Sequence, residues 1–392
     1  MKILIIRNYP SYMSVENNTY NIQEVGLAKA LIRRGHKCDI LFWTNHNEET
    51  IEIPVSKSDG KKLTVYYKRG ITVLKNTIYV NCKDLFDRYD ILQPCEYNQM
   101  EAWLISIIYP QKAVIYHGPY YSTFNKRYNL MCKFFDFFFL WHYKKDDTQF
   151  IVKSKLAKYF LESKGISNID ISGVGIDTEM LNTKELTCKE PLYVTMSKDK
   201  GRKLLYIGRF EERRNIVFIL DILKLVKQKH ENVTLYMVGT GEAEYMSKVW
   251  RYAKDIGVDD IIVWQERIEQ KYLSYIYTMS DFFLLPTEYE IFGMVLLEAM
   301  YYRNIVITTS NGGSSTLITN GKNGIIDDSK NPDSWANKIY DYINNQRKMT
   351  IMKDDASNTI KAGYTWDDLA NIFERCYERK IKNRNVNESI AC

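Results

Sequence analysis

The stretch 286–300 reads P-T-E-Y-E-I-F-G-M-V-L-L-E-A-M and follows the apolar run F-F-L-L at 282–285. That run is short and uninterrupted, as expected of a strand buried on both faces. Pro286 would end the strand, because proline has no N–H to give to the sheet. Good helix formers then dominate, so the sequence predicts a helix that begins near Ile291 or Phe292. The stretch is therefore predicted to be a buried strand, a short loop and a helix.

Two carboxylates, Glu290 and Glu298, frame this helix with seven residues between them. At a rise of about 1.5 Å per residue they would lie roughly 12 Å apart along the axis, a span that suits a ligand with polar groups at both ends. The helix start between them favours an anion, and Gly293 has no Cβ to hold a phosphate away from the backbone. The backbone groups expected to hold a diphosphate belong to Ile291, Phe292, Gly293 and Met294. The alternative is a helix with one acidic N-terminal residue and one solvated Glu, and spacing alone leaves both open.

The length and charge of the chain limit its class. A chain of 392 residues is long for one hydrophobic core, so two domains of roughly 150 to 200 residues are expected. A hydrophobic content of 45% and a charged content of 26% are those of a soluble globular protein. The net charge of +6 allows attraction to anionic substrates or anionic lipid but does not indicate nucleic acid as a partner.

The cysteines and the apolar runs of the sequence predict the compartment of the protein and its relation to a membrane. The seven cysteines are scattered and form no C-x-x-C, which predicts a reducing cytosol and neither a structural disulfide nor a zinc site. The first apolar run, 3–6, has the length of a strand and predicts no signal peptide. No stretch reaches the roughly 20 apolar residues of a membrane span, so any membrane contact would be peripheral.

Short apolar strands alternate with amphipathic helices along the whole chain, which is the pattern of a parallel α/β sheet. The predicted strands include 3–6, 38–42, 113–116, 149–152, 204–207, 233–238, 261–264, 282–285 and 305–309. Residues 183–203 are polar, rich in lysine and without periodicity, so they are predicted to be a linker.

One segment, Arg127–Lys145, is unusually aromatic and contains F-F-D-F-F-F-L-W-H-Y-K-K. Our favoured interpretation is a helix that buries its apolar face in the first domain. The alternative is an element that faces a membrane or an acceptor, because aromatic residues mix there with terminal lysines.

The sequence E-I-F-G-M-V-L-L-E-A-M, after a strand that ends in proline, resembles the Glu-x7-Glu signature of the retaining GT-B glycosyltransferases of family four. The resemblance covers residues 3 to about 378 and is strongest over 204–326. It implies an α/β GT-B fold of two Rossmann-like domains that face each other across a cleft. The implied parts are an acceptor-binding domain (1–183), a linker (184–203), a nucleotide-sugar-binding domain (204–363), and a C-terminal helix with a polar tail (364–392) that packs back on the first domain.

The same resemblance implies roles for individual residues. Gly208 and Arg209 match a Gly-Arg motif, and Arg214 stands where the family has a Lys; the two cations would neutralise the leaving diphosphate. Glu298 would hold the ribose and Glu290 the transferred sugar. His117, which follows the predicted strand 113–116, would bind hydroxyls of the sugar near the reacting centre.

Other matching positions depart from the family's pattern. Gly239 belongs to a Gly-x-Gly turn that borders the nucleotide in the family; without a third glycine it is a poor dinucleotide fingerprint, which disfavours a nicotinamide enzyme. Arg267 and Ile268 stand where the family holds the base, and Asn18-Thr19 replace a Gly-Gly pair beside the donor phosphates. An acid usual near Ser315 is also missing.

The expected function is transfer of a glycosyl group from a nucleotide-sugar, a UDP-sugar first and a GDP-sugar next, to an acceptor hydroxyl with retention. No Asp-x-Asp is present, so the resemblance implies no metal and no other cofactor. The expected setting is the cytoplasm, with peripheral contact at the inner membrane face during synthesis of a bacterial surface polysaccharide on a carbohydrate or lipid-linked acceptor. The alternatives are an inactive GT-B partner subunit, a nucleotide-sugar epimerase and, least favoured, a carbohydrate-binding module.

Overall fold

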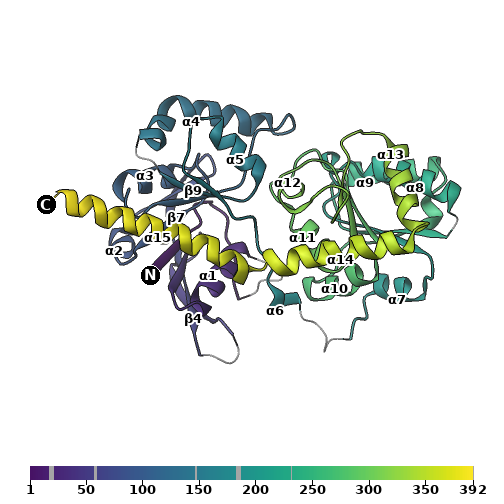
Figure 1. The fold of residues 1–392 in the computed structure, drawn as a ribbon, viewed down its shortest axis with the longest axis horizontal. Coiled ribbons are helices and arrows are strands. Elements are labelled where there is room, and N and C mark those ends of the chain that lie inside the picture. Colours follow the sequence, from purple (N-terminus) through teal and green to yellow (C-terminus); the bar gives the residue numbers. More distant parts are fainter. Residues whose placement is uncertain (17–21, 57–59, 146–147, 182–186, 231, 392) are drawn as a thin grey trace. The chain divides into compact units, whose positions relative to one another are not determined.

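Contacts within the chain divide it into two compact units, each built on its own sheets (Figure 1). The computed structural model describes residues 1–16, 22–56, 60–145, 148–181, 187–230 and 232–391. Unit 1 comprises Met1–Asp177 and Thr365–Cys392, and unit 2 comprises Thr178–Tyr364. Unit 1 is therefore made from both ends of the sequence, and unit 2 from the middle.

Unit 1 contains a mostly parallel sheet in the order β3-β4-β2-β1-β7 and a second parallel sheet in the order β10-β9-β8. Single bridges from Leu92 to Ala113 and from Cys95 to Tyr116 link β7 to β8. The strands are β1 (Lys2–Ile6), β2 (Lys37–Trp43), β3 (Glu49–Pro54), β4 (Lys62–Lys68), β7 (Ile91–Pro94), β8 (Val114–His117), β9 (Gln149–Val152) and β10 (Ile169–Ile171), beside a hairpin of β5 (Gly70–Val73) and β6 (Asn76–Tyr79). The central strands are buried along their whole length, as parallel sheets covered on both faces require.

The helices of unit 1 include the last one in the chain. They are α1 (Gln23–Arg33), α2 (Lys83–Asp87), α3 (Met100–Ile108), α4 (Lys126–Lys145), α5 (Lys155–Glu162) and α15 (Trp366–Ala391). Trp366 opens α15 and lies so close to Gly26 of α1 and to Gly175 that a Cβ on either glycine would fall within 2.5 Å of its ring. The indole fixes α15 in this unit. The predicted polar tail is helical as far as Ala391, because no glycine or proline ends the helix earlier.

Helix α4 differs from the favoured expectation of an element with one buried apolar face. Cys132, Phe135, Leu140 and Tyr143 are buried, but a second set of large apolar side chains on the same helix is exposed. The sequence pattern did not reveal this, because the two sets together make an almost continuous apolar run. Among the described residues, no helix is both long and apolar enough to cross a membrane.

Unit 2 has one parallel sheet of six strands in the order β13-β12-β11-β14-β15-β16. The strands are β11 (Arg202–Ile207), β12 (Val233–Val238), β13 (Ile262–Gln265), β14 (Phe282–Leu285), β15 (Ile305–Thr308) and β16 (Ile325–Ile326). Counted along the chain from β11, this is the order 3-2-1-4-5-6 of a doubly wound nucleotide-binding sheet. The strand order reverses between β11 and β14.

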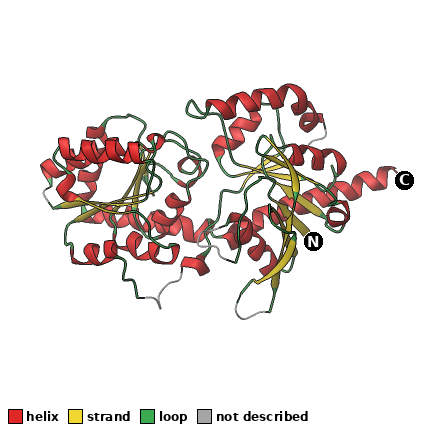
Figure 2. Cartoon of the chain, turned by 180° about the vertical axis from the view of Figure 1, so that it is seen from behind, coloured by secondary structure: helices red, strands yellow, loops and turns green. Residues whose placement is uncertain are grey.

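Helices lie on both sides of the strands of unit 2 (Figure 2). They are α6 (Thr178–Leu181), α7 (Pro191–Lys198), α8 (Ile216–Lys229), α9 (Ala243–Asp255), α10 (Gln270–Met279), α11 (Met294–Tyr301), α12 (Ser314–Leu317), α13 (Pro332–Ile343) and α14 (Gln346–Gly363). The predicted linker 184–203 is wrong where it covers α7 and the start of β11. Pro191 opens α7, and its apolar Leu192 and Met196, four residues apart, are buried in this unit.

Candidate active site

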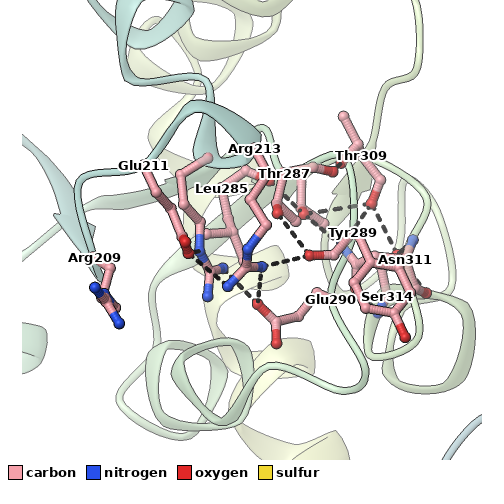
Figure 3. Close-up of polar contacts among 12 residues, drawn as sticks. Arg209, Glu211, Arg213, Leu285, Thr287, Tyr289, Glu290, Thr309, Asn311 and Ser314 are labelled. Atoms are coloured by element: carbon pink, nitrogen blue, oxygen red, sulfur yellow. Dashed lines mark hydrogen bonds and ion pairs between the residues drawn. The ribbon is translucent and has the colours of Figure 1, made fainter. Parts of the chain in front are cut away.

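The loops that follow β11 and β14 meet at the carboxyl edge of the unit 2 sheet. They occupy residues 208–215 and 286–293, on the two sides of the point where the strand order reverses. Parallel sheets of this kind bind their ligands at that point, because the loops there diverge and leave a crevice. Both loops carry charged side chains toward each other (Figure 3).

Four charged side chains from the two loops form one cluster. Arg214 Nη1 lies 2.5 Å from Glu290 Oε2, and Arg213 Nη1 lies 3.6 Å from the same oxygen. Each arginine also forms an ion pair with Glu211. Glu211 Oε1 lies 2.6 Å from Arg213 Nη2 and 3.7 Å from Arg214 Nε. The side chains of Arg214 and Glu290 are only 12% and 15% exposed. Two cations and two anions thus balance each other in a largely desolvated place, which we call the switch-point cluster.

Backbone contacts hold the two loops together beneath this cluster. Arg213 Nη1 donates to the carbonyl oxygen of Tyr289 at 2.6 Å, and the Glu288 N–H donates to the carbonyl oxygen of Arg213 at 2.8 Å. Arg213 is therefore not a solvated turn residue, since its side chain is only 20% exposed. A 3₁₀ turn, Glu212–Arg214, followed by a left-handed Asn215 aims both arginines at the β14 loop.

Arg209 does not join the switch-point cluster and projects away from it in Figure 3. The chain is extended after β11, and the Phe210 N–H donates to the carbonyl oxygen of Thr240 at 2.8 Å. Because neighbouring side chains of an extended segment alternate in direction, burial of Phe210 leaves Arg209 exposed. Of the predicted pair of cations, Arg214 lies in the cluster, beside Arg213, and Arg209 lies outside it.

Helix α11 begins at Met294, two to three residues later than predicted. Gly293 has φ +79°, a left-handed conformation that interrupts the helix before that point and that glycine adopts at little cost. Ile291 and Phe292 therefore lie in the loop, where Phe292 is buried and the Glu290 carbonyl oxygen accepts the Gly312 N–H at 3.0 Å. Glu290 belongs to the loop as well, so the two glutamates are not spaced along one helix as the 12 Å prediction assumed.

Glu298 is buried in α11 and is not the solvated residue of the alternative interpretation. Its Oε1 accepts a hydrogen bond from Gln270 Nε2 and its Oε2 one from the Tyr277 hydroxyl, both at 2.9 Å. Burial raises the pKa of Glu298 to about 7, and the two hydrogen bonds only partly offset this. Each carboxylate oxygen can accept one more hydrogen bond.

This raised pKa makes the stability of the protein depend on pH. The pKa of this carboxyl is about 7 in the folded protein and near 4.5 in the unfolded chain. At a pH between these two values the folded protein therefore binds more protons than the unfolded chain. The free energy of unfolding should therefore fall by about 3 kcal/mol as pH rises from 4.5 to 7, at about 1.4 kcal/mol per pKa unit. We expect Glu298→Gln to lose this contribution in urea titrations at pH 5 and pH 8, whereas Glu101→Gln, which removes a buried carboxyl of similar pKa in unit 1, should lose only its own. An unchanged pH dependence in Glu298→Gln would contradict the assignment.

The loop after β15 supports the β14 loop through small polar side chains (Figure 3). Thr309 Oγ1 donates to the Thr287 carbonyl oxygen at 2.5 Å, and Asn311 Nδ2 and Ser314 Oγ donate to the Thr309 carbonyl oxygen at 2.9 Å each. Thr287 Oγ1 completes the network at 3.1 Å from the carbonyl oxygen of Tyr289. Ser314, one of the residues found where the family has an acid, thus helps to fix the backbone that carries Glu290.

The remaining predicted residues have the following places. Gly239 lies against the carbonyl oxygen of Gly208, only 1.9 Å from where a Cβ would be, so packing between the two loops already requires this glycine. Arg267 is exposed and its carbonyl oxygen accepts Gln265 Nε2 at 2.9 Å, while Ile268 is buried. Asn18 and Thr19 lie outside the described residues.

His117 ends β8 in unit 1 and is fully buried. Its Nδ1 lies 2.6 Å from Glu96 Oε2, which also accepts the Gly118 N–H at 3.0 Å. Burial raises the pKa of Glu96, but His117, Lys153 and the Gly118 N–H together lower it further, so this carboxyl is ionised. Glu96 thus fixes the ring, and within the described residues His117 Nε2 has no hydrogen-bond partner. Sequence reasoning missed Glu96, although it follows β7, the neighbour of β8.

Solved structures with the same architecture extend over nearly the whole chain. HepE from Anabaena, solved in complex with UDP, superposes with a TM-score of 0.72 at 14% identity over 97% of this chain and 100% of HepE. Sucrose-phosphate synthase from Thermosynechococcus elongatus gives a TM-score of 0.67 at 15% identity over 97% and 99% of the two chains. Together with the two doubly wound units, this defines a protein of the GT-B fold, as predicted.

Comparison with protein families and curated relatives gives a narrower class than the GT-B fold. Residues 194–366, a little under half of the chain, match the family model of glycosyl transferases group 1. A lipopolysaccharide 1,2-N-acetylglucosaminetransferase of Salmonella typhimurium is 27% identical over 241 residues, 58% of this chain and 61% of that protein. The capsular polysaccharide biosynthesis glycosyltransferase CapH of Staphylococcus aureus is 28% identical over 177 residues, 45% and 48% of the two chains. The matched part thus spans about half of these relatives' lengths.

Proposed function

We propose that the protein is a retaining hexosyltransferase that moves a sugar from a nucleotide-sugar to an acceptor hydroxyl. The observation that carries this is the switch-point cluster: two arginines and Glu290 at the strand-order reversal of a nucleotide-type sheet, inside the segment that matches group 1 glycosyl transferases. A UDP-sugar is the first choice of donor, supported by the UDP and UDP-glucose bound to HepE, and a GDP-sugar is next. The names of the relatives support an acceptor in surface polysaccharide synthesis.

In the proposed reaction the bond between the anomeric carbon and the diphosphate breaks, and the acceptor oxygen bonds to that carbon on the same face. The acceptor's proton passes to the leaving phosphate. Negative charge grows on the diphosphate, and preorganised cations lower the barrier by stabilising that charge. Arg213 and Arg214 would supply these cations in our proposal, with Arg209 of the same loop as a further candidate. No metal is assigned to the reaction, because the chain has no Asp-x-Asp.

The carboxylates and His117 take binding roles in this proposal. Glu290 would accept hydroxyls of the transferred sugar and Glu298 those of the ribose, each through oxygens that can accept additional hydrogen bonds. His117 would contribute its Nε2 to sugar hydroxyls, held by Glu96 in the tautomer with the proton on Nδ1.

Donor binding can be tested by thermal shift with UDP-, GDP-, ADP- and dTDP-sugars. A ligand that binds only the native state raises the melting temperature, by an amount that grows with its concentration relative to its Kd. We expect one nucleotide class to stabilise the wild type and Glu101→Ala, which removes a buried glutamate of unit 1, but to stabilise Glu298→Ala much less.

An inactive partner subunit is the second candidate, and a specific observation favours it. Both arginines of the switch-point cluster already contact Glu290 and Glu211, so their charges are partly neutralised before any diphosphate binds. No stabilisation by any of the four nucleotide classes would support this candidate over the transferase. Stabilisation together with turnover that depends on an acceptor would exclude both it and an epimerase.

A further inference from the structure

The outer side of α4 carries an exposed row of large apolar side chains. Phe137 is 81% exposed, Leu130 69% and Phe134 65%. Spaced at three or four residues, such positions share one side of a helix. The residues of this row, which we call the α4 outer face, are Leu130, Met131, Phe134, Phe137, Phe138 and Trp141.

The α4 outer face is a different side of the helix from the one that packs against the core of unit 1. Cys132, Phe135 and Tyr143 are buried in the core of unit 1, whereas the side chains of the row are at least about one-third exposed. Rings on the outer face touch one another instead: Phe138 lies with its centroid 5.0 Å from that of Phe134 and 4.9 Å from that of Phe137. Contiguous exposed apolar patches on soluble proteins mark contact surfaces.

The exposed charges that α4 itself carries are of one sign. The exposed charged residues of α4 whose side chains are described are Lys126, Arg127, Lys133 and Lys144. The helix has one acidic residue, Asp136, and it pairs with Lys164 of the same unit. Basic residues that flank an aromatic face are the arrangement of helices that lie in the interface of an anionic bilayer, where rings enter the acyl boundary and cations meet the headgroups.

We propose that the α4 outer face docks unit 1 onto an anionic lipid bilayer. A second copy of the chain is a poorer occupant, because two such faces would bring their lysines together. The bilayer offers the opposite charge and an apolar layer for phenylalanine and tryptophan in one surface. The proposal does not depend on the reaction proposed for unit 2.

Co-sedimentation of the full chain with vesicles tests this proposal without any turnover. We expect binding to vesicles of phosphatidylcholine and phosphatidylglycerol at low salt, weaker binding at high salt, and little binding to phosphatidylcholine alone. Phe134→Ser/Phe137→Ser should lower the bound fraction by at least about tenfold, because it removes two rings that would leave water. Lys126→Gln/Lys133→Gln should bind more weakly with a smaller salt dependence.

Ile71→Ser/Val73→Ser is the matched control, because it removes two side chains of unit 1 that are also more than half exposed, on β5 instead of α4. It should bind vesicles as the wild type does. Unchanged melting temperatures would show that all variants fold. The proposal is overturned if the wild type does not bind anionic vesicles at low salt, or if Phe134→Ser/Phe137→Ser binds equally well. It is also overturned if light scattering shows a dimer that this variant dissociates while vesicles bind neither form.

Discussion

Replacing Arg214 by Met is expected to lower kcat/KM for sugar transfer by about 10²- to 10³-fold, the usual loss when one preorganised group that stabilises developing charge is removed. Arg214 is the arginine nearest to Glu290, and its side chain is largely buried. In such a place its charge is poorly screened, so it would act strongly on the leaving diphosphate. Initial rates with the donor identified by thermal shift measure the effect.

Two further variants separate charge from packing. Arg214→Lys keeps the cation that the resembling family carries at this position and should stay within about tenfold of the wild type, losing only the planar geometry of the guanidinium. Arg303→Met removes an exposed arginine that pairs with Asp354 in the same unit and should leave the rate unchanged. Equal rates for Arg214→Met and wild type would show that this side chain does not stabilise the diphosphate.

Replacing Glu96 by Ala is expected to reduce the free energy of unfolding of unit 1 by about 3–5 kcal/mol, because it removes a buried carboxylate and leaves its polar partners behind. The change would leave His117 Nδ1 and the Gly118 N–H without their acceptor in the interior. Urea titration followed by circular dichroism measures the loss.

The conservative variant Glu96→Gln retains an acceptor and should lose much less stability at pH 7. Because the folded pKa of Glu96 lies below its ordinary value of 4.5, its charge stabilises the fold above that pH and the contribution disappears as pH falls further. Wild type and Glu96→Gln should therefore converge in stability at acid pH. If Glu96→Ala were as stable as wild type, the carboxylate would not be what fixes His117.

The sequence was most informative about strands. The run Phe282–Leu285 is β14 as predicted, because four consecutive buried apolar residues bounded by a proline have few other solutions. The start of α11 was predicted too early, because the same residues that favour a helix continue across Gly293. Only the backbone conformation of that glycine decides where the first turn begins.

The composition of the switch-point cluster could not be read from the sequence. Arg213 and Arg214 are adjacent, and both point toward the β14 loop because of a single 3₁₀ turn and the carbonyl oxygen of Tyr289, far along the chain. Glu96 was missed because its partner His117 is brought to it by another strand, and Glu211 because only the 3₁₀ turn brings Arg213 and Arg214 back to it. The exposure of the α4 outer face could not be predicted either, because a nearly continuous apolar run does not indicate which of its residues pack in the core.

The attachment of α15 to unit 1 has a consequence for how the protein folds during its synthesis on the ribosome. Trp366, Leu369 and Phe373 belong to the core of unit 1 but are translated after all of unit 2. Domains generally fold during synthesis in the order in which their residues emerge. Here the middle unit has all of its residues first, while the unit that began synthesis must wait for its final helix. Until then the glycines that receive Trp366 face an unfilled slot, and the early strands persist as an unfinished domain that a chaperone could recognise.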